Sequence, residues 1–262
     1  MKSTKTISSL NNPVVKNIIA LRKNKKRKEQ NKIVIEGKVE IERAIKADFN
    51  ISSLLVCESL LSKNDNISTD KAVLYKTDLK VMRKLSYREN PSPYIAIAGS
   101  RKSNLEDVLI RDDMLVVVLE AIEKPGNLGA ILRTAEASGV DAVIINDKRV
   151  DIFNPNVIRA SLGIVFSLPV IISNIKETVT WLNKNKIEIF ITTPQAKNIY
   201  YKEDYKKSTA IVIGTEHEGL SDDWLGQANN KILIPMRGGV DSLNASVSAA
   251  LLMYEVVRQR AA

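Results

Sequence analysis

The sequence predicts an α/β protein, with a small N-terminal α/β domain and a larger C-terminal domain built on a parallel sheet. From residue 114 on, strongly apolar segments of about five residues alternate with stretches of helical periodicity. Near-continuous apolar strands separated by helices are typical of a parallel sheet covered on both faces. The expected strands of this sheet are residues 114–119, 142–146, 168–172, 187–192, 210–214 and 231–235.

The N-terminal part alternates shorter elements and contains no internal repeat. Small and charged residues interrupt the pattern over 99–113, where we place the domain boundary. The predicted domains are therefore residues 1–105 and residues 112–262. In the first of them, helices are expected at 14–29, 39–47 and 77–85, and strands at 33–37, 51–57, 72–75 and 94–98.

The composition is that of a globular protein with few reactive side chains. Of its 262 residues, 44% are apolar, which is enough for a sizeable core. The longest apolar run, 114–119, is far shorter than the roughly 20 residues of a membrane-spanning helix. The N-terminus lacks the apolar core of a signal peptide, so we expect a cytoplasmic protein. A single cysteine and a single histidine argue against a disulfide framework, a metal site and a histidine-dependent triad.

Positive charge is concentrated near the N-terminus. The chain has 39 Lys and Arg against 30 Asp and Glu, and ten of the basic residues lie in the first 32 positions, together with Glu29. Such a cluster favours a phosphate backbone as partner, whereas a solvated lysine-rich helix face is the alternative. The candidate phosphate-contacting residues are Arg22, Lys23, Lys25, Lys26, Arg27 and Lys28.

Sheets of this class bind ligands at the carboxyl ends of their strands, and the first candidate segment there is 120–146. In it, Asn127 is expected to cap a helix and Gly139 to end it. Arg133 points away from the apolar helix face formed by Leu128, Ile131, Leu132 and Ala135. Packing therefore does not explain Arg133, although most exposed helix arginines have no catalytic role.

The second candidate segment is 212–225. Gly214 directly follows a strand and Gly219 recurs five residues later, which lets the backbone approach a ligand and leaves amide groups free to bind it. Glu216 and Glu218 are candidates for a pair of acids. A solvated loop is the alternative interpretation.

The third candidate segment, 231–255, runs from a strand into an apolar helix. Gly238 and Gly239 permit backbone torsions closed to other residues, and Ser242 or Asn244 can cap the helix. A tight turn before a capped helix, with no ligand, is the alternative. Neither a GxxxxGK[ST] loop nor a GxGxxG loop after the first strand is present, which argues against P-loop and Rossmann proteins.

The three segments together resemble the ordered motifs of the SpoU (TrmH) family, which are RNA ribose 2′-O-methyltransferases of the SPOUT superfamily. They occur in the family's order within residues 114–258. The first 105 residues resemble, more loosely, the family's substrate-binding domain. The matching stretches are NLGAILR at 127–133, GTEHEGL at 214–220, and IPM at 234–236 with SLNAS at 242–246.

The resemblance implies a deep trefoil knot that binds S-adenosylmethionine, a topology that local patterns do not predict. It also implies a homodimer in which each site borrows residues from its neighbour, and a reaction that needs no metal. The cofactor-binding residues it implies are Gly214, Thr215, Glu216, Gly219, Ile234, Met236, Leu243 and Asn244.

The implied reaction transfers a methyl group to a ribose 2′-OH, with Arg133 as the central catalytic residue. Because a guanidinium is effectively always protonated, we expect Arg133 to orient a phosphate and stabilise the developing alkoxide. Proton removal is then left to phosphate or water. The other catalytic candidates are Asn127, Glu216, Ser242 and Asn244.

RNA is the implied partner, and the basic residues at 22–28 are then RNA-binding candidates. Among relatives with this domain layout, large-subunit (23S) rRNA is the more frequent substrate. The alternatives are a tRNA ribose 2′-O-methyltransferase and a catalytically silent RNA-binding protein of the same fold. A methyltransferase acting on a tRNA base would carry different motifs, and a nucleotide-binding metabolic enzyme would leave the basic N-terminus unexplained.

Overall fold

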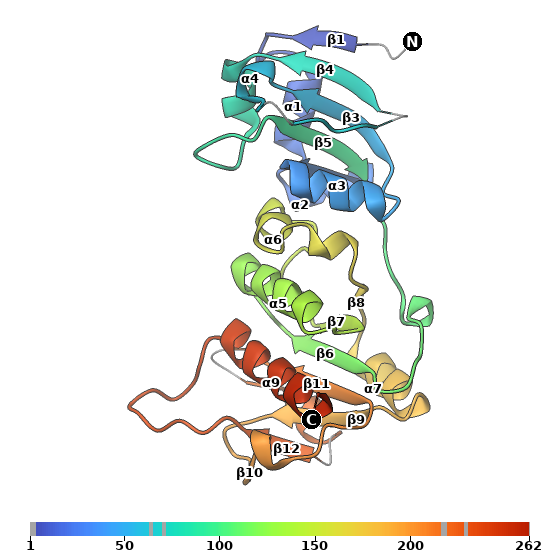
Figure 1. The fold of residues 1–262 in the computed structure, drawn as a ribbon, viewed down its shortest axis with the longest axis vertical. Helices are drawn as coiled ribbons and strands as arrows, with labels where there is room; N and C mark the ends of the chain where they lie inside the picture. Colours follow the sequence, from blue (N-terminus) through green and yellow to red (C-terminus); the bar gives the residue numbers. More distant parts are fainter. Residues whose placement is uncertain (1–3, 63–64, 70–71, 216–218, 228–229, 262) are drawn as a thin grey trace. The chain divides into compact units, whose positions relative to one another are not determined.

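A computed structural model describes residues 4–62, 65–69, 72–215, 219–227 and 230–261 of the chain. The chain divides into two compact units (Figure 1). The first unit consists of Met1–Arg101 together with Asp151–Ser167, and the second of Lys102–Val150 together with Leu168–Ala262. The boundary expected between residues 105 and 112 lies close to Arg101, after which the chain first passes into the second unit. The sequence pattern did not assign Asp151–Ser167 to the first unit.

The first unit contains a five-stranded mixed sheet in the order β1-β4-β3-β5-β2. Strands β1 and β3 pair with β4 in parallel, whereas β5 pairs with β3 and β2 in antiparallel fashion. Its elements are β1 (Thr4–Ile7), α1 (Pro13–Ala20), α2 (Asn24–Gln30), β2 (Lys32–Glu36), α3 (Lys38–Lys46), β3 (Ile51–Val56), η1 (Glu58–Leu60), β4 (Val73–Thr77), α4 (Leu79–Leu85), β5 (Tyr94–Gly99), α6 (Pro155–Ala160) and η3 (Ile164–Phe166).

The single helix expected over residues 14–29 is two helices, α1 and α2, separated by residues 21–23. The break has a tertiary cause. At the break, the Arg22 guanidinium donates hydrogen bonds to the carbonyls of Lys84, Leu85 and Ser86, at the C-terminal end of α4. A cation at that end satisfies carbonyls that lack helix partners and complements the helix dipole.

The segment Asp151–Ser167 is built into the first unit by polar and aromatic contacts. The Arg27 guanidinium donates to one carboxylate oxygen of Asp151, from Nη2 at 2.7 Å and from Nε at 2.9 Å. The ring of Phe49 lies against Phe153 and Phe166, with centroid distances of 6.1 and 4.9 Å. These contacts join residues more than 100 positions apart in the sequence.

The second unit contains a seven-stranded sheet in the order β10-β12-β9-β11-β6-β7-β8, and every pair in it is parallel. All six predicted strands are confirmed, and the short β10 is added. The elements of this unit are η2 (Leu105–Asp107), β6 (Leu115–Glu120), α5 (Pro125–Ala137), β7 (Ala142–Asn146), β8 (Val170–Ile172), α7 (Ile175–Lys184), β9 (Glu188–Thr192), β10 (Asn198–Ile199), η4 (Tyr200–Lys202), β11 (Thr209–Ile213), α8 (Asp222–Leu225), β12 (Asn230–Leu233) and α9 (Ala245–Arg260).

Helices cover both faces of this sheet, as predicted. Val116 and Val118 of β6 share a core cluster with Val179 of α7 and Trp224 of α8. Side chains alternate along a strand, so the other residues of β6 face the opposite side, where α5 and α9 pack together and α9 lies over β11 (Figure 1). The architecture is thus the mixed α/β fold with a parallel sheet that the sequence predicted, and the trefoil knot stays a prediction.

Within the described ranges, no helix combines the length and the hydropathy that crossing a bilayer requires.

Candidate functional site

The three candidate segments follow strands of the second unit's sheet. The first follows β6, the second follows β11, which pairs with β6, and the third follows β12. Because parallel strands end at the same edge of a sheet, the three segments share one side of the unit. The helices that leave the first and third segments, α5 and α9, are packed against each other.

Asn127 and Asn244 make the direct link between the first and third segments. The Asn244 side-chain amide donates to Asn127 Oδ1 at 3.2 Å. Asn244 also caps α9 as predicted, because its Oδ1 accepts from the backbone N–H of Ser246 at 2.9 Å. Two residues that the sequence separates by 117 positions are thus brought into one site.

The prediction that Asn127 caps its helix is wrong, since Lys124 is the N-cap of α5 and Pro125 opens the helix. A proline in the first helical position has no N–H to satisfy and already has a helical φ, so the helix begins there. Asn127 lies in the first turn, where its side chain reaches Asn244 instead. The helix does end as expected, with Gly139 at a φ of +72°.

Arg133 lies on the exposed side of α5, while the predicted apolar face is buried. Among the described residues, none accepts a hydrogen bond from its guanidinium, which therefore stays available to a ligand. The confirmed buried face consists of Leu128, Ile131, Leu132 and Ala135.

The loop after β11 is closed by its own backbone. The N–H of Thr215 donates to the carbonyl of Gly219 at 2.9 Å, and Gly219 has a φ of +71°. A Cβ at Gly214 would lie 2.1 Å from the Gly219 oxygen, so only glycine fits at that position. The close approach predicted for Gly214 is therefore to the loop itself. Glu216, His217 and Glu218 lie outside the described residues.

The junction between β12 and α9 is partly buried at first and then exposed. Ile234 and Met236 are half-buried, Ser242 is exposed and Leu243 is half-buried again. Gly238 and Gly239 do not use the torsions, closed to other residues, that glycine permits. Neither has a positive φ, and a Cβ on either would meet open space. This stretch faces solvent, so nothing forces its backbone into the left-handed region.

The basic run of the first unit separates into two kinds of residue. Arg27 is buried, and besides Asp151 it donates to the carbonyls of Leu21 and Arg22 at 2.8 and 2.7 Å. The Arg22 guanidinium is held by the α4 carbonyls and lies 4.8 Å from the Tyr87 ring centroid. Both arginines thus serve the unit's own structure. The exposed members of the run are Lys23, Lys25, Lys26 and Lys28.

Sequence reasoning missed Glu120, the last residue of β6. Its side chain is 5% exposed, and its two carboxylate oxygens accept hydrogen bonds from Ser221, one from Oγ at 2.6 Å and one from the backbone N–H at 2.9 Å. This contact joins the end of β6 to the residue that follows the glycine loop. A charged residue closing an otherwise apolar strand was the signal in the sequence.

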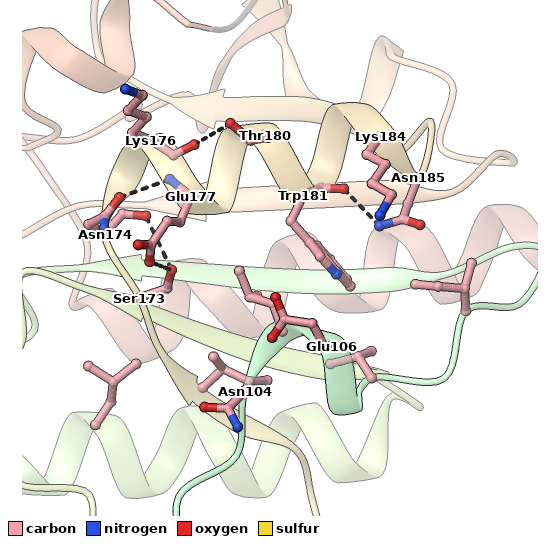
Figure 2. Close-up of a pocket in the computed structure, with 15 residues that line it drawn as sticks. Asn104, Glu106, Ser173, Asn174, Lys176, Glu177, Thr180, Trp181, Lys184 and Asn185 are labelled. Carbon is pink, nitrogen blue, oxygen red and sulfur yellow. Dashed lines mark hydrogen bonds between the residues drawn. The ribbon is translucent and has the colours of Figure 1, made fainter.

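A pocket of about 860 Å³ opens elsewhere in this unit, between α7 and the segment around η2 (Figure 2). In Figure 2 the Trp181 indole points from α7 toward that segment, near Glu106. Two lysines, Lys176 and Lys184, and two glutamates, Glu106 and Glu177, are among the residues that line the pocket. None of the described candidate residues lines it, and α7 covers the sheet face opposite α5 and α9. We therefore do not assign the candidate site to this pocket.

The described residues contain no group of three or more His, Cys, Asp or Glu side chains arranged to hold a metal ion. Cys57 is buried in the first unit with its sulfur 3.3 Å from the Ser59 hydroxyl.

Comparison with known proteins agrees with this geometry. The sequence model of the SpoU rRNA Methylase family matches residues 114–254, and that of the MRM3-like substrate binding domain matches residues 12–96. The chain is 28% identical to the 23S rRNA (guanosine(2553)-2′-O)-methyltransferase RlmP of Bacillus subtilis, over 96% of this chain and 99% of that protein.

Solved structures of similar proteins share the whole fold. One is the crystal structure of an RNA 2′-O ribose methyltransferase, 40% identical, with a TM-score of 0.87 over 98% of this chain and 100% of that one. Another is the SpoU methyltransferase AviRb from Streptomyces viridochromogenes in complex with the cofactor AdoMet, 27% identical, with a TM-score of 0.88 over 96% and 99% of the two chains. The resemblance drawn from the three motifs is confirmed, and the chain belongs to the SpoU rRNA methylase family.

Proposed function

We propose that the protein is an S-adenosylmethionine-dependent methyltransferase that acts on a ribose 2′-OH of large-subunit rRNA. The observation that carries the proposal is the Asn244–Asn127 contact, which joins the first and third family motifs on the helix that presents Arg133. Membership of the SpoU family and similarity to RlmP, a 23S rRNA 2′-O-methyltransferase, support the reaction and the substrate class.

The segments after β11 and β12 suit the cofactor. AviRb was solved with AdoMet bound, and the present chain has the same fold. A backbone hydrogen bond holds Thr215 and Gly219 together, and the half-buried side chains of Ile234 and Met236 after β12 would offer apolar surface to an adenine. The residues that would hold the cofactor are Gly214, Thr215, Glu216, Gly219, Ile234, Met236, Leu243 and Asn244.

When bound, the cofactor supplies an electrophilic sulfonium methyl group. The chain must then hold the ribose 2′-oxygen in line and stabilise its negative charge as its proton leaves. Arg133, exposed and permanently protonated, is suited to binding the adjacent phosphate and the developing alkoxide. The proton passes to phosphate or water, and the reaction needs no metal. The residues that would position the ribose and the loops are Asn127, Glu216, Ser242 and Asn244.

The first unit would supply RNA contacts through its exposed lysines. The proposed location of the protein and its RNA substrate is the cytoplasm. Lysines at 23, 25, 26 and 28 remain exposed, whereas Arg22 and Arg27 are used internally. The match to the MRM3-like substrate binding domain supports this assignment. A tRNA substrate and a catalytically silent RNA-binding role are the alternatives.

A homodimer is the proposed assembly, and α9 offers a surface for it. Val247, Leu251 and Tyr254 lie four and three positions apart on this helix, so they share one face, and all three are exposed. Val240, just before the helix, is also exposed. Exposed apolar residues that gather on one helix face are typical of an interface between subunits.

The test is transfer of labelled methyl from S-adenosylmethionine to rRNA and to tRNA from cells lacking the gene. We expect label in rRNA as an alkali-resistant 2′-O-methyl dinucleotide. Arg133→Ala should lower the rate at least about 100-fold, as loss of a charge-stabilising donor does. Lys184→Ala, which removes an exposed cation from α7 on the other sheet face, is the matched control and should change little. Label in tRNA alone would refute the rRNA assignment, and cofactor binding without transfer to naked RNA or ribosomal particles would indicate a silent protein.

A further inference from the structure

The buried carboxylate of Glu120 has both oxygens occupied by one residue. Ser221 Oγ donates to Oε1 at 2.6 Å, and the Ser221 backbone N–H donates to Oε2 at 2.9 Å. Removing a carboxylate from water is costly, and an apolar side chain at the end of a buried strand would stabilise the fold without that cost. The charge is therefore explained better by what it holds than by stability.

What Glu120 holds is the far end of the glycine loop. The loop leaves the sheet at Ile213, which is paired with Leu119 of β6. It returns at Ser221, which is bound by the next residue of the same strand. Both ends of the loop are thus fixed to β6, and the Thr215–Gly219 hydrogen bond closes it between them.

The helix after the loop also has an anchor of its own in the core. Trp224 of α8 is fully buried in the core of the second unit, and Leu220 belongs to the same cluster. Ser221 is the N-cap of α8 but makes no capping hydrogen bond with its side chain, because its hydroxyl is directed to Glu120. The two hydrogen bonds therefore set the position of the junction between loop and helix.

Glu120 also begins the connection to the first motif. Ala121 has a φ of +53°, and its N–H donates to the Asn146 carbonyl of the neighbouring strand at 3.0 Å. The chain turns there and reaches α5, which carries Asn127 and Arg133. One side chain thus links the loop of the second motif to the strand end from which the first motif starts.

We propose that Glu120 is a positioning residue for the cofactor loop, which fixes Ser221 so that the described ends of the loop, residues 214–215 and 219–220, stay where they can accept S-adenosylmethionine. The proposal rests on the proposed function, because it concerns the same cofactor site. It assigns Glu120 no contact with the cofactor and no part in the methyl transfer.

The test compares Glu120→Ala, Glu120→Gln and Ser221→Ala by calorimetric binding of S-adenosylmethionine, with the melting temperature of each. Glu120→Ala loses two hydrogen bonds to a charged acceptor and should bind S-adenosylmethionine about 10- to 100-fold more weakly. Ser221→Ala keeps the backbone hydrogen bond and should bind it about 3- to 10-fold more weakly. Glu120→Gln should bind nearly as wild type, since an amide can accept from the Ser221 N–H and donate to its hydroxyl. The KM for RNA should not change in any of them.

The first unit offers a matched control in Glu36. This residue is also buried, and it accepts from the Ser86 hydroxyl at 2.6 Å and from the Tyr87 N–H at 2.8 Å. Glu36→Ala should lower the melting temperature but leave the cofactor Kd within about twofold, because its hydrogen bonds lie in the unit without the glycine loop.

The proposal is overturned if folded Glu120→Ala binds the cofactor as wild type does. If that variant does not fold, unchanged binding by Ser221→Ala overturns it. A wild-type protein that fails to bind S-adenosylmethionine would instead refute the proposed function. The two failures are therefore distinguishable in one set of measurements.

Discussion

The ion pair between Arg27 and Asp151 allows a sharp test of how the chain is divided. The side chains are 5% and 11% exposed. Arg27→Met removes two hydrogen bonds to Asp151 and two to the carbonyls of Leu21 and Arg22, and takes the Arg27 guanidinium away from a buried carboxylate. Breaking one side of a buried pair costs about 3–5 kcal/mol. That is a large part of the roughly 5–15 kcal/mol by which a domain is stable.

Two optical signals in a urea titration separate the units. Both tryptophans, Trp181 and Trp224, belong to the second unit, whereas far-ultraviolet circular dichroism reports on both units. Arg27→Met should lower the midpoint of the dichroism transition by at least about 1 M urea and shift the tryptophan fluorescence transition less. Adding Asp151→Asn should recover part of the loss, because a neutral amide costs less to bury than a carboxylate.

Lys26→Met is the matched control, because the Lys26–Glu29 pair is 48% and 43% exposed and should contribute less than about 1 kcal/mol. Equal effects of Arg27→Met and Lys26→Met would refute the assignment of a structural role to Arg27. A fluorescence shift as large as the dichroism shift would contradict the assignment of Asp151–Ser167 to the first unit alone.

Two further predictions concern the second unit. Gly214→Ala should abolish cofactor binding in the calorimetric assay, because the added Cβ would lie 2.1 Å from the Gly219 oxygen. Gly226→Ala is the control and should bind the cofactor normally, because its Cβ would lie at an ordinary 3.5 Å from the nearest atom. Normal binding by Gly214→Ala would show that the loop conformation is not the one that receives the cofactor. Leu251→Asp should halve the mass seen in sedimentation velocity if α9 forms the dimer interface, while Leu109→Asp, at an exposed apolar residue outside α9, should not. A Leu251→Asp protein of unchanged mass would remove α9 from the proposed interface.

Local pattern was sufficient for the main strands of the second unit because they are determined by short-range signals. The six apolar strands, the buried face of α5 and the Asn244 cap were all readable from spacing and residue type. The same approach failed where a contact joins distant residues. Asp151 lies 124 positions from Arg27, and nothing near either residue indicates the partner. The helical pattern at Pro155–Ala160 would look the same in either unit.

Charged residues were the main source of error, and the reason is physical. A charge in a sequence is assigned by default to solvent or to a ligand, since an unpaired buried charge is prohibitively costly. Arg27 and Glu120 belong to a third class, in which the cost is offset by several hydrogen bonds to one place in the fold. Only Glu120 stands out in retrospect as a charge in an apolar setting, because it closes a strand of five apolar residues, whereas Arg27 is the buried residue of a lysine-rich helix. Such residues fix where a loop or a distant segment sits. Substituting them is therefore a more direct test of the site's geometry than substituting further exposed lysines.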